Sequence, residues 1–563
     1  METTDPGGLP IGVARMSAMS SHLSRRSRVA IFASVFLVGS AYGLASTLTG
    51  VYQAYATASF RAHSLLATSK TLRVVFAIAA QPAAAKLTDA LGRLEIVWLC
   101  ALFFVAGLVV QATSGGVVGF VAGAVLQQVG LSTTQVMVEV IVADLSSTRL
   151  RLFCYTIPNL HFVFTIWLSG DISASTLSHS SWRWGIGMWP IVYVACLVPF
   201  VAVFKLGERS ARKNGAPVLE ADDWRVVLKR LFWQIDAVGL VLVMAILALI
   251  LAPVSLAGGV SSKWGSPGII APIVVGVVLV PAFVFWEMRA PHPLLPFERM
   301  RDRSVWGALG VGVFFNFAVA MQRGFLYTVL VVAFDFSVKE ATRISTVYSF
   351  MSFACGPLVG LAVYCVRRLR PFILFGVVVF TVAFGLLVRY RGGQGTDNKA
   401  GVVAGQVLLG LGASFFGFAV TVAMQVTLKH EHVAVMIALF FSFQLIGNAL
   451  GNSVSGSIWS QVLPRQLTQR LGNQTQAMQA FASPFVMAAQ FPVGTPTRSA
   501  IVESYQYVQR ILCAVGLGLC LPTIAFAAVI RNPELNDEQT LAVSDEDKRD
   551  GHFHGGGTTV EQK

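Results

Sequence analysis

The sequence predicts an all-α protein that crosses a membrane many times. Hydrophobic residues make up 55% of its 563 residues and charged residues only 12%, about half the charged share of an average soluble protein. The apolar residues gather in runs of about 20, the length that a helix needs to cross a bilayer. Irregular backbone is too costly in lipid, so each run is expected to be helical. This composition excludes a soluble enzyme, a disordered chain and a disulfide-rich scaffold.

Fourteen runs are long and apolar enough to span the bilayer. The stretch 96–138 carries no charged residue, and the Ser-Gly-Gly sequence at 114–116 divides it into two helices. The second span is the least regular, because Lys70 and Arg73 interrupt its outer part. The predicted spans are 29–48, 65–86, 96–113, 117–138, 152–170, 184–204, 235–257, 267–286, 304–330, 343–366, 371–388, 400–428, 433–460 and 507–530.

The distribution of positive charge orients these spans. Of the 42 Lys and Arg residues, 27 fall in the two tails and in the loops on the same side as the tails. Cytoplasmic loops collect Lys and Arg, so both termini are expected in the cytoplasm. The net charge of +14 therefore marks orientation and no nucleic-acid surface. The N-terminal tail is not expected to be a signal peptide, because the apolar run after it is too long for one.

The spans group into two bundles of six helices with two extra helices between them. The long polar stretch near the end is expected outside, and it carries the glycosylation sequon at Asn473. The predicted segments are a cytoplasmic N-tail at 1–28, an N-terminal bundle at 29–204, a basic cytoplasmic linker at 205–234, two central helices at 235–286, a C-terminal bundle at 304–530 with an extracellular loop at 461–506, and a cytoplasmic C-tail at 531–563.

The motif content favours a secondary transporter, which performs no chemistry on its substrate and is not an enzyme. There is no P-loop for ATP and no channel filter sequence. The 51 glycines, many of them inside helices, suit helices that pack closely and rock against each other. The seven cysteines lie in apolar stretches without a CxxC pair. No cofactor and no metal site are therefore expected.

The loop after the second span carries a charged turn in the spacing D-x-x-G-R, formed by Asp89, Gly92 and Arg93. It resembles the loop motif of the major facilitator superfamily. Gly92 permits a tight turn, and Arg93 is expected to pair across to the other bundle in a latch that breaks during the transport cycle. The alternative is an ordinary charged loop. Further candidates for the latch, at the inner end of the fourth span, are Asp144, Arg149 and Arg151.

Several separate segments between residues 40 and 540 carry a more specific resemblance. They include GVYQAYAT at 50–57, QPAAAK at 81–86, VEVIVAD at 138–144, WRWGIGMW at 182–189, YQYVQR at 505–510 and RNPELNDEQ at 531–539. Together they resemble the 14-helix siderophore–iron transporter family of fungi. The resemblance implies a major facilitator fold and proton-driven uptake of ferric siderophore chelates. The same family includes a branch that exchanges glutathione for protons.

One position departs from the family pattern. The family commonly places Asp after Tyr-Gly-Leu in the first helix, whereas Tyr42-Gly43-Leu44 is followed here by Ala45. Proton coupling must then use another group, or substrate and coupling differ, or transport is lost. Export or exchange of glutathione or drugs, a receptor that binds without transporting, and a channel stay open as alternatives. The GPxxGG sequence of drug antiporters is missing from the fifth span, which lowers the drug-export alternative.

Two ionisable residues inside apolar spans are candidates for proton coupling, because such groups are costly in lipid. Glu139, near the inner end of the fourth span, can bind the coupling proton, since burial favours the neutral form of a carboxyl. Its alternative role is an ion pair with Arg149 or Arg151. His161, in the fifth span, can relay protons near physiological pH or simply bond two helices.

Large hydroxamate chelates call for aromatic and neutral hydrogen-bonding side chains. Arg323 is expected near the outer third of the ninth span with Tyr327, where it either meets a carbonyl-rich ligand or snorkels to the interface. Candidates on cavity-lining helices, with simple packing as the alternative for each, are Tyr52, Tyr55, Gln128, Trp167 and Gln425. Candidates for capture, or for a plug over the outer mouth, are Phe485, Phe491, Tyr505 and Tyr507.

The expected partners are a ferric siderophore, bound as the intact chelate, together with protons and the lipid bilayer. No nucleic acid is expected, and the chain is expected to be a monomer. The plasma membrane is the expected location, with endosomal or vacuolar membranes as the alternative, because no targeting signal is readable in the sequence.

Overall fold

The computed structural model describes Gly12, Arg15, Met16, Met19, Ser20 and residues 23–535, except 61–65, 214–231, 257–263, 295–301, 393–396, 427–432 and 483. Its helices are α2 (Arg25–Ser59), α3 (Leu66–Leu91), α4 (Arg93–Thr113), α5 (Val117–Leu145), α6 (Arg151–Thr156), the 3₁₀ turn η2 (Ile157–Asn159), α7 (Phe162–His179), α8 (Trp182–Gly187), α9 (Trp189–Lys213), α11 (Ala237–Leu256), α12 (Pro267–Glu287), α13 (Arg303–Arg323), α14 (Leu326–Val332), α15 (Val338–Val366), α16 (Arg370–Arg391), α17 (Asp397–Phe416), α18 (Ala419–Gln425), α19 (Val433–Leu471), α20 (Gln474–Ala482), α21 (Pro484–Gln490) and α22 (Pro496–Val529).

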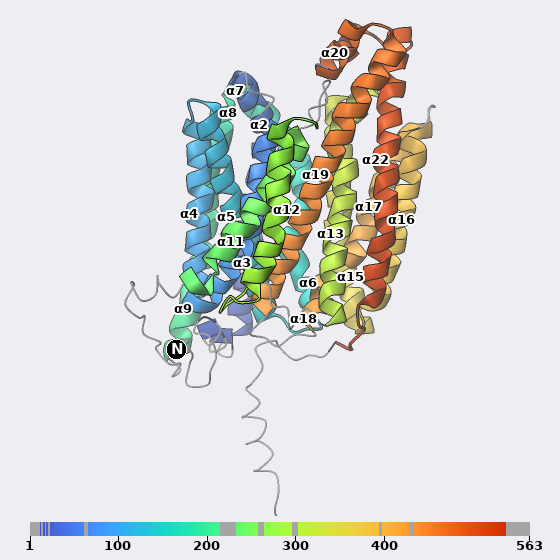
Figure 1. The fold of residues 1–563 in the computed structure, drawn as a ribbon. Helices are drawn as coiled ribbons and strands as arrows, with labels where there is room; N and C mark the ends of the chain where they lie inside the picture. The colour runs from blue at the N-terminus through green and yellow to red at the C-terminus, as the bar shows by residue number, and fades with distance from the viewer. Residues whose placement is uncertain are drawn as a thin grey trace, which may run out of the picture.

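The predicted number of spans is confirmed. Within the described residues, 14 helical stretches have the length and apolar composition to cross a membrane. Figure 1 shows α2 to α9 on one side and α13 to α22 on the other, and we call these groups the N-half and the C-half. We call the end at which α2 begins and α22 ends the inner end, and the opposite end the outer end.

Four spans that the hydropathy pattern predicts as continuous are broken helices, and one of them, the sixth, divides into α8 and α9 at Met188. The fifth span divides into α6, η2 and α7 around Pro158, which lacks the N–H that a continuous helix would use. The ninth divides into α13 and α14 at Gly324, and the twelfth into α17 and α18 at Gly417. Broken spans are common at the ligand and ion sites of transporters.

Glycines allow neighbouring helices to approach at backbone distance. A Cβ atom at Gly130 of α5 would overlap the backbone of Phe104 in α4. A Cβ atom at Gly412 of α17 would lie 2.7 Å from the backbone nitrogen of Phe380 in α16. In the C-half, a Cβ at Gly447 of α19 would overlap the carbonyl of Val313 in α13. Close approach compensates for the absence of a hydrophobic driving force between helices in lipid.

The two central helices, α11 and α12, form a hairpin that contacts both halves. Helix α11 packs against α3 of the N-half and α19 of the C-half. Near the inner end, Lys86 of α3 donates hydrogen bonds to the carbonyls of His292 (2.8 Å) and Pro293 (2.9 Å), just after α12. Toward the outer end, Ser457 of α19 donates to the carbonyl of Val254 in α11 (3.1 Å). The hairpin thus covers the seam where α3 meets α19.

The polar stretch predicted as an outer loop at 461–506 is mostly helical. Helix α19 continues to Leu471, α20 and α21 follow, and α22 begins at Pro496. Figure 1 shows α19 and α22 extending past the other helices, with α20 at the tip. The extension has its own apolar core, in which Tyr505 is 1% exposed and stacks edge-on against Trp459 (centroids 5.2 Å apart). The prediction that Tyr505 lies on a loop is therefore wrong, because it lies in a packed helix.

We predict that Gly447→Ala lowers the midpoint of thermal unfolding of the detergent-solubilised protein. The new methyl group must push α19 away from α13, and overpacking of this kind costs about 1–3 kcal/mol. Gly456→Ala in the same helix is the matched control, because its Cβ would meet no atom within 4 Å. Equal midpoints for the two variants would contradict close packing at the α13–α19 crossing.

Candidate functional site

The charged turn after α3 forms a buried ion-pair network around Arg93. The Arg93 guanidinium binds Asp89 Oδ1 through Nη1 (2.8 Å) and Asp144 Oδ2 through Nε (3.1 Å). Its Nη1 also donates to the carbonyl of Thr88 (3.1 Å). Gly92 has φ +123°, a backbone conformation that favours glycine. Three of the predicted latch residues thus surround Arg93, but all lie in the N-half, so the expected pairing of Arg93 across to the other half is wrong.

Other residues join the two halves at the inner end. Arg149 donates to the carbonyl of Tyr364 in α15 (3.0 Å), and its guanidinium lies 3.9 Å from the centre of that tyrosine ring. Arg151 and Tyr155 both donate to Gln425 Oε1 of α18, at 3.2 and 2.9 Å. Gln425, which was predicted to bind ligand, is fully buried in this contact. In this conformation it holds the halves together instead of facing a ligand.

The backbones of the two halves also touch at this end. A Cβ at Gly360 of α15 would lie 2.7 Å from the Cα of Phe153 in α6. A Cβ at Gly356 would lie 2.8 Å from the Thr156 side chain. The stretch Gly356–Gly360 therefore lets α15 press directly on α6, and the inner ends of the halves are closed against each other.

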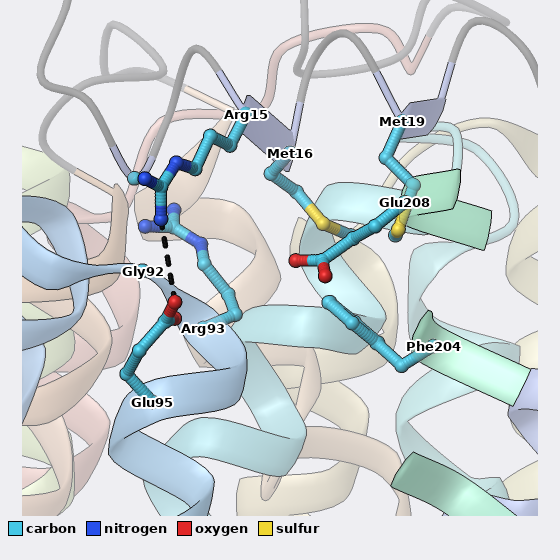
Figure 2. Close-up of a pocket in the computed structure, with 9 residues that line it drawn as sticks. Arg15, Met16, Met19, Gly92, Arg93, Glu95, Phe204 and Glu208 are labelled. Carbon is cyan, nitrogen blue, oxygen red and sulfur yellow. Dashed lines mark hydrogen bonds and ion pairs between the residues drawn. The ribbon is translucent and has the colours of Figure 1, made fainter. Parts of the chain in front are cut away.

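The described residues before α2, among them Arg15, Met16 and Met19, lie against the charged turn, as Figure 2 shows. Arg15 pairs with Glu95 of α4 (3.3 Å) and donates to the carbonyl of Leu91 (3.5 Å). Met16 and Met19 are buried at 2% and 1% exposure and line a small hollow with Phe204 of α9. The sequence predicts this segment only as part of a polar tail. The available signal was the pair of apolar residues Met16 and Met19, three positions apart in an otherwise polar tail.

Glu139 and His161 both border the break in the fifth span. Asn159 Nδ2 donates to Glu139 Oε1 (3.5 Å), whereas Glu139 Oε2 is buried without a partner. His161 Nδ1 donates to the carbonyl of Pro158 (2.9 Å), and its Nε2 is buried without a partner. Gly43 of α2 packs directly against the imidazole ring. The alternative ion pair of Glu139 with an arginine is not found among the described residues.

The remaining candidates for ligand binding are dispersed. Tyr52 is buried against Gly185. Gln128 accepts a hydrogen bond from Arg73 (2.9 Å). Trp167 is 52% exposed, with the guanidinium of Arg343 4.7 Å from its ring centre.

Two candidates lie in the C-half near the outer end, and two have undescribed side chains. Arg323 is exposed at the outer end of α13, and Tyr327 is partly buried in α14. The side chains of Tyr55 and Phe485 lie outside the described part.

The outer extension contains a polar cavity of about 270 Å³ between α19 and α20, lined in part by Gln461, Arg465, Gln469 and Gln474. Asn473 is exposed and caps α20 by accepting from the backbone N–H of Thr475 (2.9 Å). Phe491 and Tyr507 lie elsewhere in the extension, partly buried and 44% exposed respectively. Across the described residues, no group of three or more His, Cys, Asp or Glu side chains has the arrangement to hold a metal ion.

Curated relatives match along most of the chain. Siderophore iron transporter 1 of Saccharomyces cerevisiae is 37% identical over 529 residues, which cover 92% of this chain and 84% of the relative. Siderophore iron transporter 1 of Schizosaccharomyces pombe is 32% identical over 532 residues, which cover 94% and 86%. No protein-family model matches the chain.

The fold matches solved transporters at low sequence identity. The crystal structure of the peptide transporter POT in complex with sulfate superposes with a TM-score of 0.52 at 16% identity, and the match covers 90% of this chain and 99% of that one. The predicted fold class, a major facilitator fold with 14 membrane-spanning helices, is confirmed.

We predict that Asp144→Ala destabilises the protein strongly. The substitution leaves the Arg93 guanidinium, whose side chain is 3% exposed, with a single carboxylate, and breaking a buried pair costs about 3–5 kcal/mol. The matched control is Glu534→Ala, which breaks the exposed pair with Arg368 (3.8 Å) and is expected to cost about 0–1 kcal/mol. Thermal unfolding in detergent measures both. A small effect of Asp144→Ala would mean that Arg93 is satisfied in another way.

Proposed function

The chain belongs to the siderophore iron transporter family of the major facilitator superfamily, and from that membership we propose that it imports intact ferric siderophore chelates together with protons. The observation that carries the proposal is the 37% identity to a siderophore iron transporter over 92% of the chain. Both termini, and with them the inner end, are proposed to face the cytoplasm, and the plasma membrane is the proposed location.

The closed inner end corresponds to one state of the proposed import cycle. Three side chains of the fifth-span region, Arg149, Arg151 and Tyr155, bond to the C-half there. In alternating access, a carrier closed at the cytoplasmic end is ready to take its ligand from outside. Import then requires these bonds to break while others form at the outer end. Export of another solute, such as glutathione or a drug, would use the same two conformations, but the solute would bind at the inner end and leave at the outer end.

Glu139 is the proposed site of the coupling proton. The residue is 5% exposed, and its carboxyl group has one oxygen bonded only to Asn159 and one oxygen without a partner. An uncompensated carboxylate in this position is costly, so proton uptake favours the packed arrangement around the helix break. The first helix has Ala45 where the family commonly has Asp, which leaves Glu139 as the buried acid nearest to this break on α5. His161 is proposed to pass the proton along.

The chelate is proposed to meet the outer extension before it enters the space between the halves. The cavity between α19 and α20 offers neutral amide groups and one arginine, which suit an oxygen-rich ligand. Phe491 lies in the same extension and can add an aromatic surface. No residue in this path needs to bind iron, because the iron stays inside the chelate.

We predict that cells lacking other carriers accumulate radio-iron from purified ferric hydroxamate chelates when this protein is produced. A proton uncoupler is expected to reduce accumulation at least about tenfold, because the gradient drives uptake. Empty-vector cells are the control. Absence of accumulation with every chelate would contradict import, and accumulation unaffected by the uncoupler would contradict proton coupling alone.

We also predict that Glu139→Gln abolishes concentrative uptake but preserves exchange of labelled for unlabelled chelate across the membrane. The amide resembles a permanently protonated carboxyl, so the halves can still rock with ligand bound but no proton is released. Glu503→Gln, at an exposed carboxylate, is the control, and surface amounts of both variants are compared. Normal concentrative uptake by Glu139→Gln would remove this residue from the coupling mechanism.

A further inference from the structure

Three helices of the N-half meet at an arginine that has no carboxylate partner. Arg73 of α3 donates from Nη1 to Gln53 Oε1 of α2 (3.3 Å) and from Nη2 to Gln128 Oε1 of α5 (2.9 Å). Its Nε is buried without a partner. Among the ion pairs of the described residues, none includes Arg73. The guanidinium is therefore held by two neutral amide oxygens.

A guanidinium stays protonated at any physiological pH, and an unpaired charge inside a membrane protein is costly. Two other buried arginines of the described residues meet carboxylates: Arg93 binds two, and Arg498 binds one. Arg151, at the contact between the halves, and Arg391 of the C-half are also held only by neutral groups, chiefly Gln425 (3.2 Å) and Gln322 (3.0 Å) respectively. Both of these arginines, however, are 0% exposed, so neither is accessible to a ligand in this conformation. Arg73 differs from these fully buried arginines because it is partly exposed.

Arg73 is partly exposed in the structure. It lies about two turns from the outer start of α3, and Gln53 lies about two turns before the outer end of α2. The group is thus in the outer part of the bundle, away from the closed inner end.

The position also relates Arg73 to the proposed proton site. Gln128, which anchors Arg73, and Glu139 are on the same face of α5, about three turns apart. That separation is roughly 16 Å along the helix. A ligand held at Arg73 would therefore lie between the outer end and Glu139, within the same half.

We propose that Arg73, positioned by Gln53 and Gln128, binds a negatively charged group of the chelate, such as a free carboxylate, and makes the transporter prefer ferric chelates of net negative charge. A guanidinium can bind a carboxylate with two parallel hydrogen bonds, and the two amide oxygens that now hold it are weaker acceptors. The ligand supplies the counter-charge that the protein lacks at this point. This inference rests on the proposed function and adds the substrate class to it.

The competing possibility is that Arg73 only bridges α2, α3 and α5. A bridge would stabilise the N-half and would affect every chelate equally. A binding site would distinguish chelates by charge. The two roles of Arg73 therefore differ in charge selectivity and not in the presence of activity.

The test measures the half-saturating concentration for uptake of three ferric hydroxamate chelates: one bearing free carboxylates, one neutral and one bearing an ammonium group. Arg73→Gln is expected to raise the value for the carboxylate-bearing chelate about tenfold, the effect of about one charge-assisted hydrogen bond. The value for the neutral chelate is expected to change less than about twofold. Arg389→Gln, at an exposed arginine at the outer end of α16, removes the same charge elsewhere and is expected to change neither value.

A second variant tests the inference without removing the arginine. Gln128→Glu places a carboxylate on Arg73 and is expected to abolish the preference for the negative chelate, and it decides the question if Arg73→Gln does not reach the membrane. Equal shifts for all three chelates, or no shift for any, would overturn the inference while leaving import intact. Absence of uptake by the unsubstituted protein would instead contradict the proposed function.

Discussion

The lack of water in the bilayer core is the constraint on which this structure depends. Every backbone group must bond within the chain, so the spans are helices, and helices without a hydrophobic driving force must approach closely to attract each other. Glycines at the α4–α5, α16–α17 and α13–α19 contacts provide that approach. The same constraint makes each charged side chain inside the bundle costly unless it has a partner, because the bilayer core provides no water to bind it. Arg93 is paired with two carboxylates, and Glu139 has a hydrogen-bond partner for only one of its two oxygens. Arg73 is bound only by neutral amides, and its proposed counter-charge comes from the ligand.

The inner end separates strong interactions from reversible ones. The carboxylate pairs of Arg93 remain inside the N-half, where they keep α3, α4 and α5 together as one rigid unit. The bonds that cross to the C-half use neutral acceptors, the carbonyl of Tyr364 and the amide of Gln425. A hydrogen bond to a neutral acceptor contributes less than a buried ion pair. The halves can therefore part at this end without exposing an unpaired carboxylate, while each half keeps its shape.

The sequence predicts the fold better than the site. Hydropathy finds all 14 spans, because few structures besides a membrane-spanning helix accommodate an apolar run of this length. It does not find the break at Pro158, since the residues from Arg151 to Ser173 are apolar enough on average to be predicted as one span. Polar and proline residues dominate the outer segment around Tyr505 and so predict a loop, yet its apolar residues form a core of their own. Gln425 carried no signal of its place between the halves, which depends on residues about 270 positions away. Arg73 stands out in the sequence only as an interruption of an apolar span, and that misfit is the property that makes it a candidate for ligand binding.

The hairpin of α11 and α12 makes the two seams between the halves unequal. One seam, between α3 and α19, lies under the hairpin, which is attached to both helices. Among the described residues, the hairpin makes no extensive contact with the other seam, where α6 and α7 meet α15. Acyl chains of the surrounding lipid therefore have direct access to only one of the two surfaces that separate during the cycle. During the rocking movement, the seam between α3 and α19 stays covered by the hairpin, whereas the seam between α6, α7 and α15 does not. The bilayer can therefore influence the rate of this movement only through the uncovered seam.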